Sequence, residues 1–110
     1  MKLRELEASF VKWRLPDSFQ DVDQLSEADG LRFLCPVCWE RNSGPVGTHA
    51  ILCWFTARVP PDLRPGPGRW NPQGTGLHDL SFVPPGKPSV QLTAGCMAHF
   101  HIVNGEIKPA

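Results

Sequence analysis

Two pairs of residues with the same short spacing constrain the fold of this chain most strongly. Cys35 and Cys38 form a Cys-Pro-Val-Cys motif directly after the short apolar run 31–34, and Cys96 and His99 form a second pair with two residues between them. A CxxC motif with a distant CxxH motif supplies three thiolates and one imidazole, a donor set typical of closed, tetrahedral zinc sites. The spacing therefore predicts a structural Zn²⁺ ion bound by Cys35, Cys38, Cys96 and His99.

The length of the chain explains why such an ion is useful. A chain of 110 residues forms a single domain, here taken as 1–110, with a modest core. A metal that joins the first third of the chain to its end adds stability that a small core does not supply. The charged N-terminal residues lack the apolar stretch of a signal peptide, and no apolar run approaches the roughly 20 residues that cross a bilayer. We expect a cytoplasmic protein that does not enter a membrane, where clustered cysteines bind metal rather than form disulfides.

The remaining histidines and cysteines leave alternatives at this site. His101 follows His99 by two residues and lies on the same face of an extended segment, so it is the alternative fourth ligand. Cys53 lies in the apolar run 49–55 and is expected to be a buried apolar side chain. A redox role for the CxxC motif requires that it open a helix in a thioredoxin-like βαβ unit, and the turn-forming residues 42–45 argue against a helix there.

The distribution of proline and glycine predicts the fold class. The chain has 12 prolines and 10 glycines, which favours short strands and turns over long helices. Hydrophobic residues make up 41% of the chain, so it can form a folded core. We predict an all-β, zinc-stapled sheet or sandwich of short strands with little helix. It carries a polar loop over 17–30 and a long Pro/Gly-rich loop over 60–79; the expected strands are 9–15, 31–34, 49–55, 80–83, 89–93 and 100–103, with a return strand at 107.

The Pro/Gly-rich loop is the candidate binding region. It contains Trp70, and three arginines lie in it or beside it: Arg58, Arg64 and Arg69. Trp70 either fastens the loop to the body of the domain or projects from it as a contact for a partner. The equal numbers of basic and acidic residues, 11 of each, argue against a broad grip on nucleic acid, which needs a basic surface. A protein partner is therefore the favoured prediction, and a nucleic-acid backbone is the weaker one.

A catalytic zinc ion would need an open coordination position and a nearby general base. The side chains available for that role are His101, His49, His78, Asp79 and Glu40, of which His101 and Asp79 are the favoured candidates. The sequence has no HExxH motif, and three thiolates reduce the Lewis acidity of zinc. We predict a non-enzymatic protein, with a zinc-dependent hydrolase that uses an open metal position near His101 as the alternative.

The order of these motifs resembles a family of small proteins from bacteriophages and bacterial mobile elements. The matching pieces lie between residues 9 and 107 and include Cys35-Pro36-Val37-Cys38, Arg69-Trp70, Pro88-Ser89-Val90, Cys96-Met97-Ala98-His99-Phe100 and Asn104-Gly105. The resemblance implies a phage-related origin and the same zinc ligands, with His101 a departure from the family's aromatic or apolar residue. It implies no reaction. We expect a zinc-stabilised binding module that acts on a host protein in the host cytoplasm as an adaptor or inhibitor; the alternative is an accessory structural protein of the virion.

Overall fold

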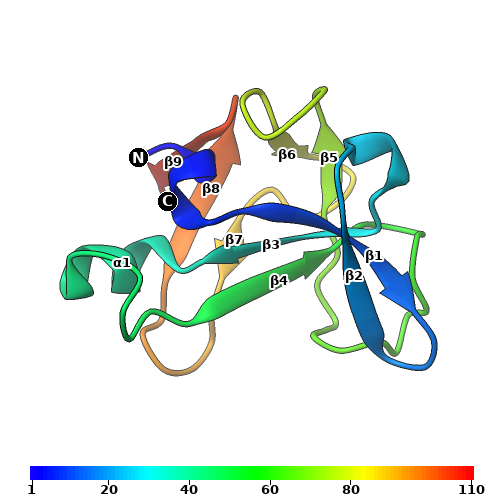
Figure 1. Cartoon of the computed structure of the whole chain (residues 1–110), viewed down its shortest axis with the longest axis horizontal. Helices are drawn as coiled ribbons and strands as arrows, with labels where there is room; N and C mark the ends of the chain where they lie inside the picture. The colour runs from blue at the N-terminus through cyan, green and yellow to red at the C-terminus, as the bar shows by residue number, and fades with distance from the viewer.

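The computed structural model describes the whole chain, residues 1–110. Its strands form three antiparallel sheets, with the strand orders β2-β1-β3-β4, β5-β6 and β7-β8-β9 (Figure 1). One short α-helix and two 3-10 turns, Leu3–Leu6 and Leu25–Glu27, complete the secondary structure. The prediction of a small all-β domain of short strands is confirmed.

The four-stranded sheet is built from the first half of the chain: β1 (Ser9–Arg14), β2 (Ser18–Val22), β3 (Gly30–Leu34) and β4 (Ala50–Trp54). The predicted polar loop over 17–30 is corrected here, because β2 and the turn Leu25–Glu27 lie inside it. β2 pairs along its length with β1, but its side chains are almost all exposed. Backbone pairing is therefore the main interaction of this edge strand, with Phe19 edge to face against Trp54, and no alternation of apolar and polar residues marks it in the sequence.

The α-helix α1 (Pro36–Asn42) begins inside the CxxC motif. The expectation that no helix would form there was wrong for two reasons. Pro36 occupies the first turn, where its missing N–H costs no hydrogen bond and its fixed φ suits a helix. Ser43 ends the helix in a left-handed conformation, with φ of 55°, so the turn residues terminate a short helix instead of preventing one.

The second half of the chain supplies the smaller sheets: β5 (Asn71–Gln73), β6 (Ser81–Val83), β7 (Val90–Gln91), β8 (His99–Val103) and β9 (Glu106–Pro109). The predicted Asn-Gly turn joins β8 to β9, with positive φ at both Asn104 and Gly105. The chain termini meet beside this turn, where the Leu3 N–H donates to the Gly105 carbonyl (Figure 1).

The main core lies between the four-stranded sheet and the sheet that contains β8. Phe33 from β3 meets Phe100 from β8 edge to face, with ring centroids 5.9 Å apart. Cys53 on β4 is fully buried in this core, and burial raises the pKa of its thiol far above the ordinary range. Cys53 therefore packs as an apolar side chain, as its sequence context predicts.

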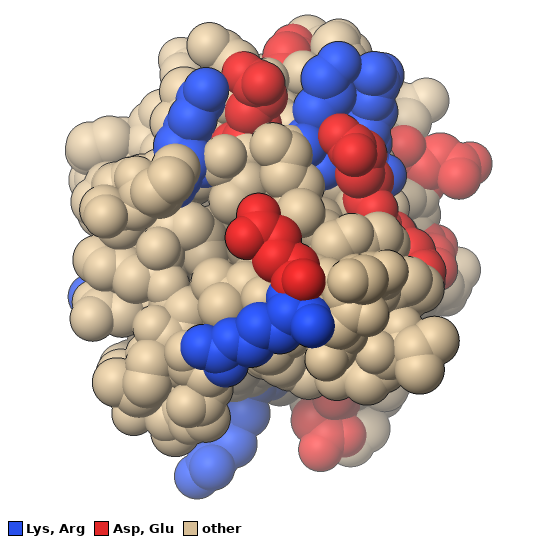
Figure 2. Space-filling model, turned by 90° about the vertical axis from the view of Figure 1, so that its left-hand side faces the viewer, with Lys and Arg blue, Asp and Glu red and all other residues tan.

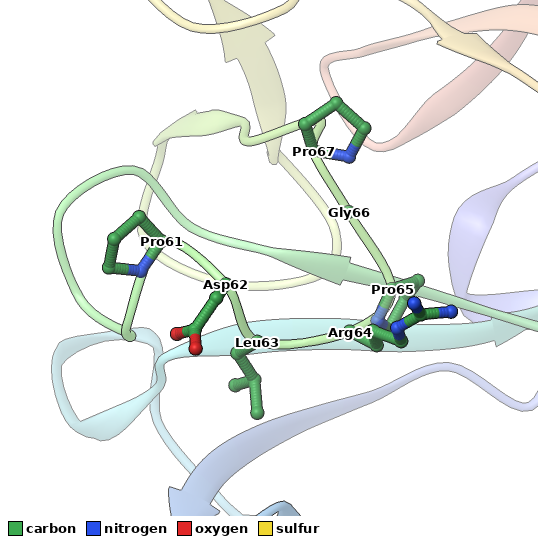
Figure 3. A pocket seen from close by; sticks show the side chains of 7 residues that line it. All are labelled: Pro61, Asp62, Leu63, Arg64, Pro65, Gly66 and Pro67. Atoms are coloured by element: carbon green, nitrogen blue, oxygen red, sulfur yellow. The ribbon is translucent and has the colours of Figure 1, made fainter.

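Arg69 organises the first part of the Pro/Gly-rich loop. Its guanidinium donates to the carbonyl oxygens of Pro60, Leu63 and Pro65 at 3.1, 2.9 and 3.1 Å. The stretch 61–67 lines an open hollow of about 750 Å³, with the Asp62 and Arg64 side chains pointing apart (Figure 3). One side chain thus replaces the regular backbone pairing that the prolines prevent.

Trp70 fastens the second part of the same loop to the body of the domain. Its backbone N–H donates to the Trp54 carbonyl at 3.1 Å, and its indole Nε1 donates to the Ser89 carbonyl at 2.9 Å. Its ring lies against Phe82, with centroids 6.0 Å apart. Of the two roles predicted for Trp70, the structure supports the one in which it holds the loop in place.

The role of Trp70 can be measured with the substitution Trp70→Phe. We expect it to lower the free energy of unfolding by about 1–2 kcal/mol, because the Ser89 carbonyl loses its donor and the ring becomes smaller. Trp13→Phe is the matched control, since the Trp13 indole makes a longer bond of 3.3 Å to the Pro16 carbonyl at an exposed site. Urea denaturation that gave the same loss for both variants would contradict this role.

Candidate metal centre

Four potential ligands from three separate segments converge at one end of the domain. Their ligand atoms all lie within 4.8 Å of one another, and they belong to Cys35, Cys38, His49 and Cys96. The first two flank the junction of β3 and α1, His49 immediately precedes β4, and Cys96 lies in the turn between β7 and β8. The centre therefore joins the four-stranded sheet to the three-stranded sheet.

Two of the distances between ligand atoms match tetrahedral coordination of zinc. Bond lengths of about 2.3 Å to sulfur and 2.0 Å to nitrogen place two thiolates about 3.8 Å apart and a thiolate and an imidazole nitrogen about 3.5 Å apart. The Sγ atoms of Cys35 and Cys96 are 3.7 Å apart, and Cys96 Sγ lies 3.5 Å from His49 Nε2. The Cys35, Cys96 and His49 side chains are thus spaced as ligands of one tetrahedral ion, and Cys38 Sγ lies within 4.8 Å of all three.

Backbone amides influence the acidity of two of the thiols. The amides of Cys38 and Val37 act to lower the pKa of Cys35, and the amide of Ala98 acts to lower the pKa of Cys96. Such donors favour a thiolate over a thiol, and the thiolate is the form that binds metal. Both short Cys-containing turns thus place backbone amides where they favour the thiolate form of a cysteine.

The thiols of Cys35 and Cys96 differ in their acidity. Burial is the largest influence on Cys35 and raises the pKa of its thiol to about 11. The contact with His49 is the largest influence on Cys96 and lowers the pKa of its thiol to about 7. A doubly charged cation at the centre would favour the thiolate at both positions, because it offsets the cost of burying the negative charge.

The predicted fourth ligand is corrected from His99 to His49. Phe100 and Ile102 face the core from β8, so the alternation of the strand directs His99 and His101 to its other face. There His99 Nε2 lies 3.2 Å from Ser89 Oγ, and His101 Nδ1 lies 3.0 Å from the Pro88 carbonyl oxygen. Neither histidine belongs to the ligand group, so the alternative ligand His101 is corrected as well.

His49 was missed because its partner is distant in the sequence. β3 and β4 pair with a register that places His49 opposite Cys35, and the Cys35 N–H donates to the His49 carbonyl at 2.9 Å. The ligand therefore arises from a cross-strand pair, in which side chains of opposite residues are neighbours. The signal in the sequence was the pairing of the two apolar runs that flank the helix.

A redox role for the CxxC motif requires a helix, which is present, and a parallel βαβ unit, which is not. α1 connects β3 to β4, which are antiparallel neighbours, whereas a thioredoxin-like unit joins parallel strands. Cys35 and Cys38 are both free thiols in this structure, and Cys96 and His49 complete the group around them. The arrangement is that of a metal-binding group rather than of an isolated dithiol.

Most of the predicted binding residues make contacts within the fold. Arg58 donates from Nη1 to the Ala28 carbonyl at 2.6 Å, and its guanidinium lies over the ring of Phe55. Arg69 and Trp70 hold the Pro/Gly-rich loop, as described above. The side chain of Arg64 is exposed and remains available to a partner. A binding role for this set stays a prediction.

Comparisons of the chain with models of known protein families, with curated proteins and with solved structures give no match. The resemblance to phage proteins therefore has no support beyond the motifs that carry it. None of the helices has the length and apolar character that a bilayer-crossing helix requires.

The metal centre can be tested by changing one cysteine inside it and one outside it. We expect Cys38→Ser to lose most of its bound zinc, measured by elemental analysis after gel filtration, because the substitution removes one of the four donors. Cys53→Ala is the control and should keep its zinc. Chelation should lower the free energy of unfolding on the order of several kcal/mol in the unaltered protein and have little effect on Cys38→Ser. Equal zinc content in both variants would refute the ligand set.

The identity of the histidine ligand needs its own test. His49→Ala should weaken Co²⁺ binding by more than roughly a hundredfold, because even changes outside the ligand shell cost 10–100-fold. It should also alter the visible absorption bands of the Co²⁺-loaded protein, which report the ligands and geometry. His99→Ala and His101→Ala should leave affinity and spectrum unchanged; a spectral change in either one would restore that histidine as a ligand.

Proposed function

We propose that this protein is a zinc-stabilised binding module that acts through contacts with another protein and does not catalyse a reaction. The observation that carries this proposal is the closed donor set of Cys35, Cys38, His49 and Cys96. Four protein ligands complete a tetrahedral site and leave no position for a substrate or an activated water. The metal then contributes folding energy and fixes the loops around it.

The surface near the metal centre supports a protein partner. Val46, in the loop before His49, is 86% exposed, and Met97, next to Cys96, is 58% exposed. Large apolar side chains held outward on loops whose ends are fixed by a metal can be buried at an interface without a large loss of conformational entropy. The two loops therefore present apolar contacts in a defined arrangement.

The charge distribution favours a protein over a nucleic acid. Figure 2 shows basic and acidic side chains interspersed on the face that it presents, with no extended field of one sign. The whole chain has no net formal charge. Non-specific binding to a phosphate backbone depends on a clustered basic surface, so the mixed pattern supports a protein partner.

Fewer observations support the alternative roles. A hydrolase would need a base beside an open metal position, and His101, the residue predicted for that place, bonds to the Pro88 carbonyl outside the ligand group. A phage origin, a host-directed adaptor or inhibitor role and a place in a virion rest on the resemblance of motif order alone. They stay predictions about where the module acts.

Affinity isolation with matched variants tests the binding function. The zinc-loaded protein should co-purify a partner in stoichiometric amount from its native cells, and the complex should re-form from the two purified proteins. Cys38→Ser should lose most of that binding, whereas Cys53→Ala should retain it. Zinc-dependent turnover of ester, amide or phosphoester substrates that His49→Ala abolishes would overturn the non-catalytic assignment.

A further inference from the structure

A groove separates the free edges of two sheets beside the metal centre. Its volume is about 620 Å³; residues 50–52 of β4 form one wall and residues 90–93 the other. β4 pairs only with β3, and β7 pairs only with β8, so each strand ends its sheet on the side of the groove. Free strand edges are sites where another extended chain can pair.

The backbone of β4 has unused hydrogen-bonding groups at this edge. The bonds from Cys35 N–H to the His49 carbonyl and from Phe55 N–H to the Asp29 carbonyl set the alternation of the ladder. In an antiparallel pair, the residues between such bonded positions direct their N–H and C=O groups to the opposite side. Ala50 and Leu52 therefore direct theirs away from β3, and no hydrogen bond within the chain reaches them.

The opposite wall follows the same rule. The Leu92 N–H donates to the Ala98 carbonyl, which makes Val90 and Leu92 the bonded positions opposite β8. Gln91 lies between them, so its N–H and C=O groups point away from β8. They too have no hydrogen-bond partner within the chain. The groove therefore has unpaired backbone donors and acceptors on both walls.

Contacts between the two walls close the groove at each end. At one end His49, which directly precedes β4, lies 3.5 Å from Cys96 in the loop that follows β7. At the other end Trp70 joins Trp54 of β4 to Ser89, the residue before β7. The β4 segment between these ends spans about 13 Å, the length of roughly four extended residues.

The lining determines what the groove can bind. Lys87 is its one residue with a permanent charge, and it contains no acidic residue. Apolar side chains of Leu52, Leu92 and Trp70 also line it. A peptide with an apolar side chain toward these residues and a carboxylate near Lys87 complements both features.

We propose that an extended peptide segment of a partner protein binds in this groove by pairing with the edge of β4 on one side and with the Gln91 backbone on the other, with an acidic side chain at the Trp70 end. This inference rests on the proposed binding function and names its site. A lone strand fits better than a second copy of this chain, because the residues 65–68 and the wall of β7 flank the β4 edge and obstruct a flat sheet-to-sheet approach. Because contacts between its walls close the groove at both ends, it suits a short segment.

Selection from an mRNA-displayed library of random peptides on the zinc-loaded protein tests the site. Enriched peptides should alternate apolar and polar residues and carry an acidic residue. Binding of one such peptide should shift the amide resonances of Ala50, Leu52 and Gln91. Gln91→Pro should weaken binding roughly tenfold relative to Gln91→Ala, because proline removes the outward N–H without breaking the β7–β8 ladder. Lys87→Glu should weaken binding of acidic peptides further.

The results separate the groove from the wider function. Three outcomes would overturn the proposed peptide site. They are the enrichment of no peptide, equal peptide affinity of Gln91→Pro and Gln91→Ala, and amide shifts that are confined to another surface. A concentration-dependent dimer whose interface protects Ala50 and Leu52 from hydrogen exchange would replace the peptide with a second copy. If the partner isolated from native cells binds the Gln91→Pro variant with unchanged affinity, the proposal of a binding module is retained and the proposal of this groove as its site is rejected.

Discussion

The contact between Cys96 and His49 is the interaction on which the arrangement of the sheets depends. These residues lie in turns beside different sheets, and their ligand atoms are 3.5 Å apart. Cys35 and Cys38 add the turn at the end of β3 to the same point. A metal ion there would compensate for a core that a chain of this length cannot make large, and it would close long loops whose entropy otherwise favours the unfolded chain.

Trp70 provides the second connection between the same parts of the molecule. The Pro/Gly-rich loop cannot form regular strands over its first half, yet Arg69 donates hydrogen bonds to its carbonyl groups, and Trp70 ties it to the ends of β4 and β7. Three of the four residues that the sequence suggested as a recognition surface, Arg58, Arg69 and Trp70, thus make contacts within the domain. The surfaces proposed for recognition are instead the groove between the two connections and the loops beside the candidate metal centre.

The sequence predicts the parts of this fold that depend on local chemistry. The spacing of Cys35 and Cys38, with Cys96 as a distant third thiolate, is visible without a structure because short turns fix how sulfurs are presented. His49 is not visible in this way, since its role depends on the register between β3 and β4. His99 has the expected spacing but lies on a strand whose alternate residues enter the core, and burial of Phe100 decides its direction.

His49 belongs both to the ligand group and to the wall of the groove. A change in the position of the His49 imidazole on metal binding would therefore be felt in the groove. Thermodynamic linkage makes such an effect reciprocal: the factor by which a bound metal changed the affinity of the groove would be the factor by which occupation of the groove changed the affinity for the metal. One imidazole would thus couple the availability of a metal ion to the formation of a complex.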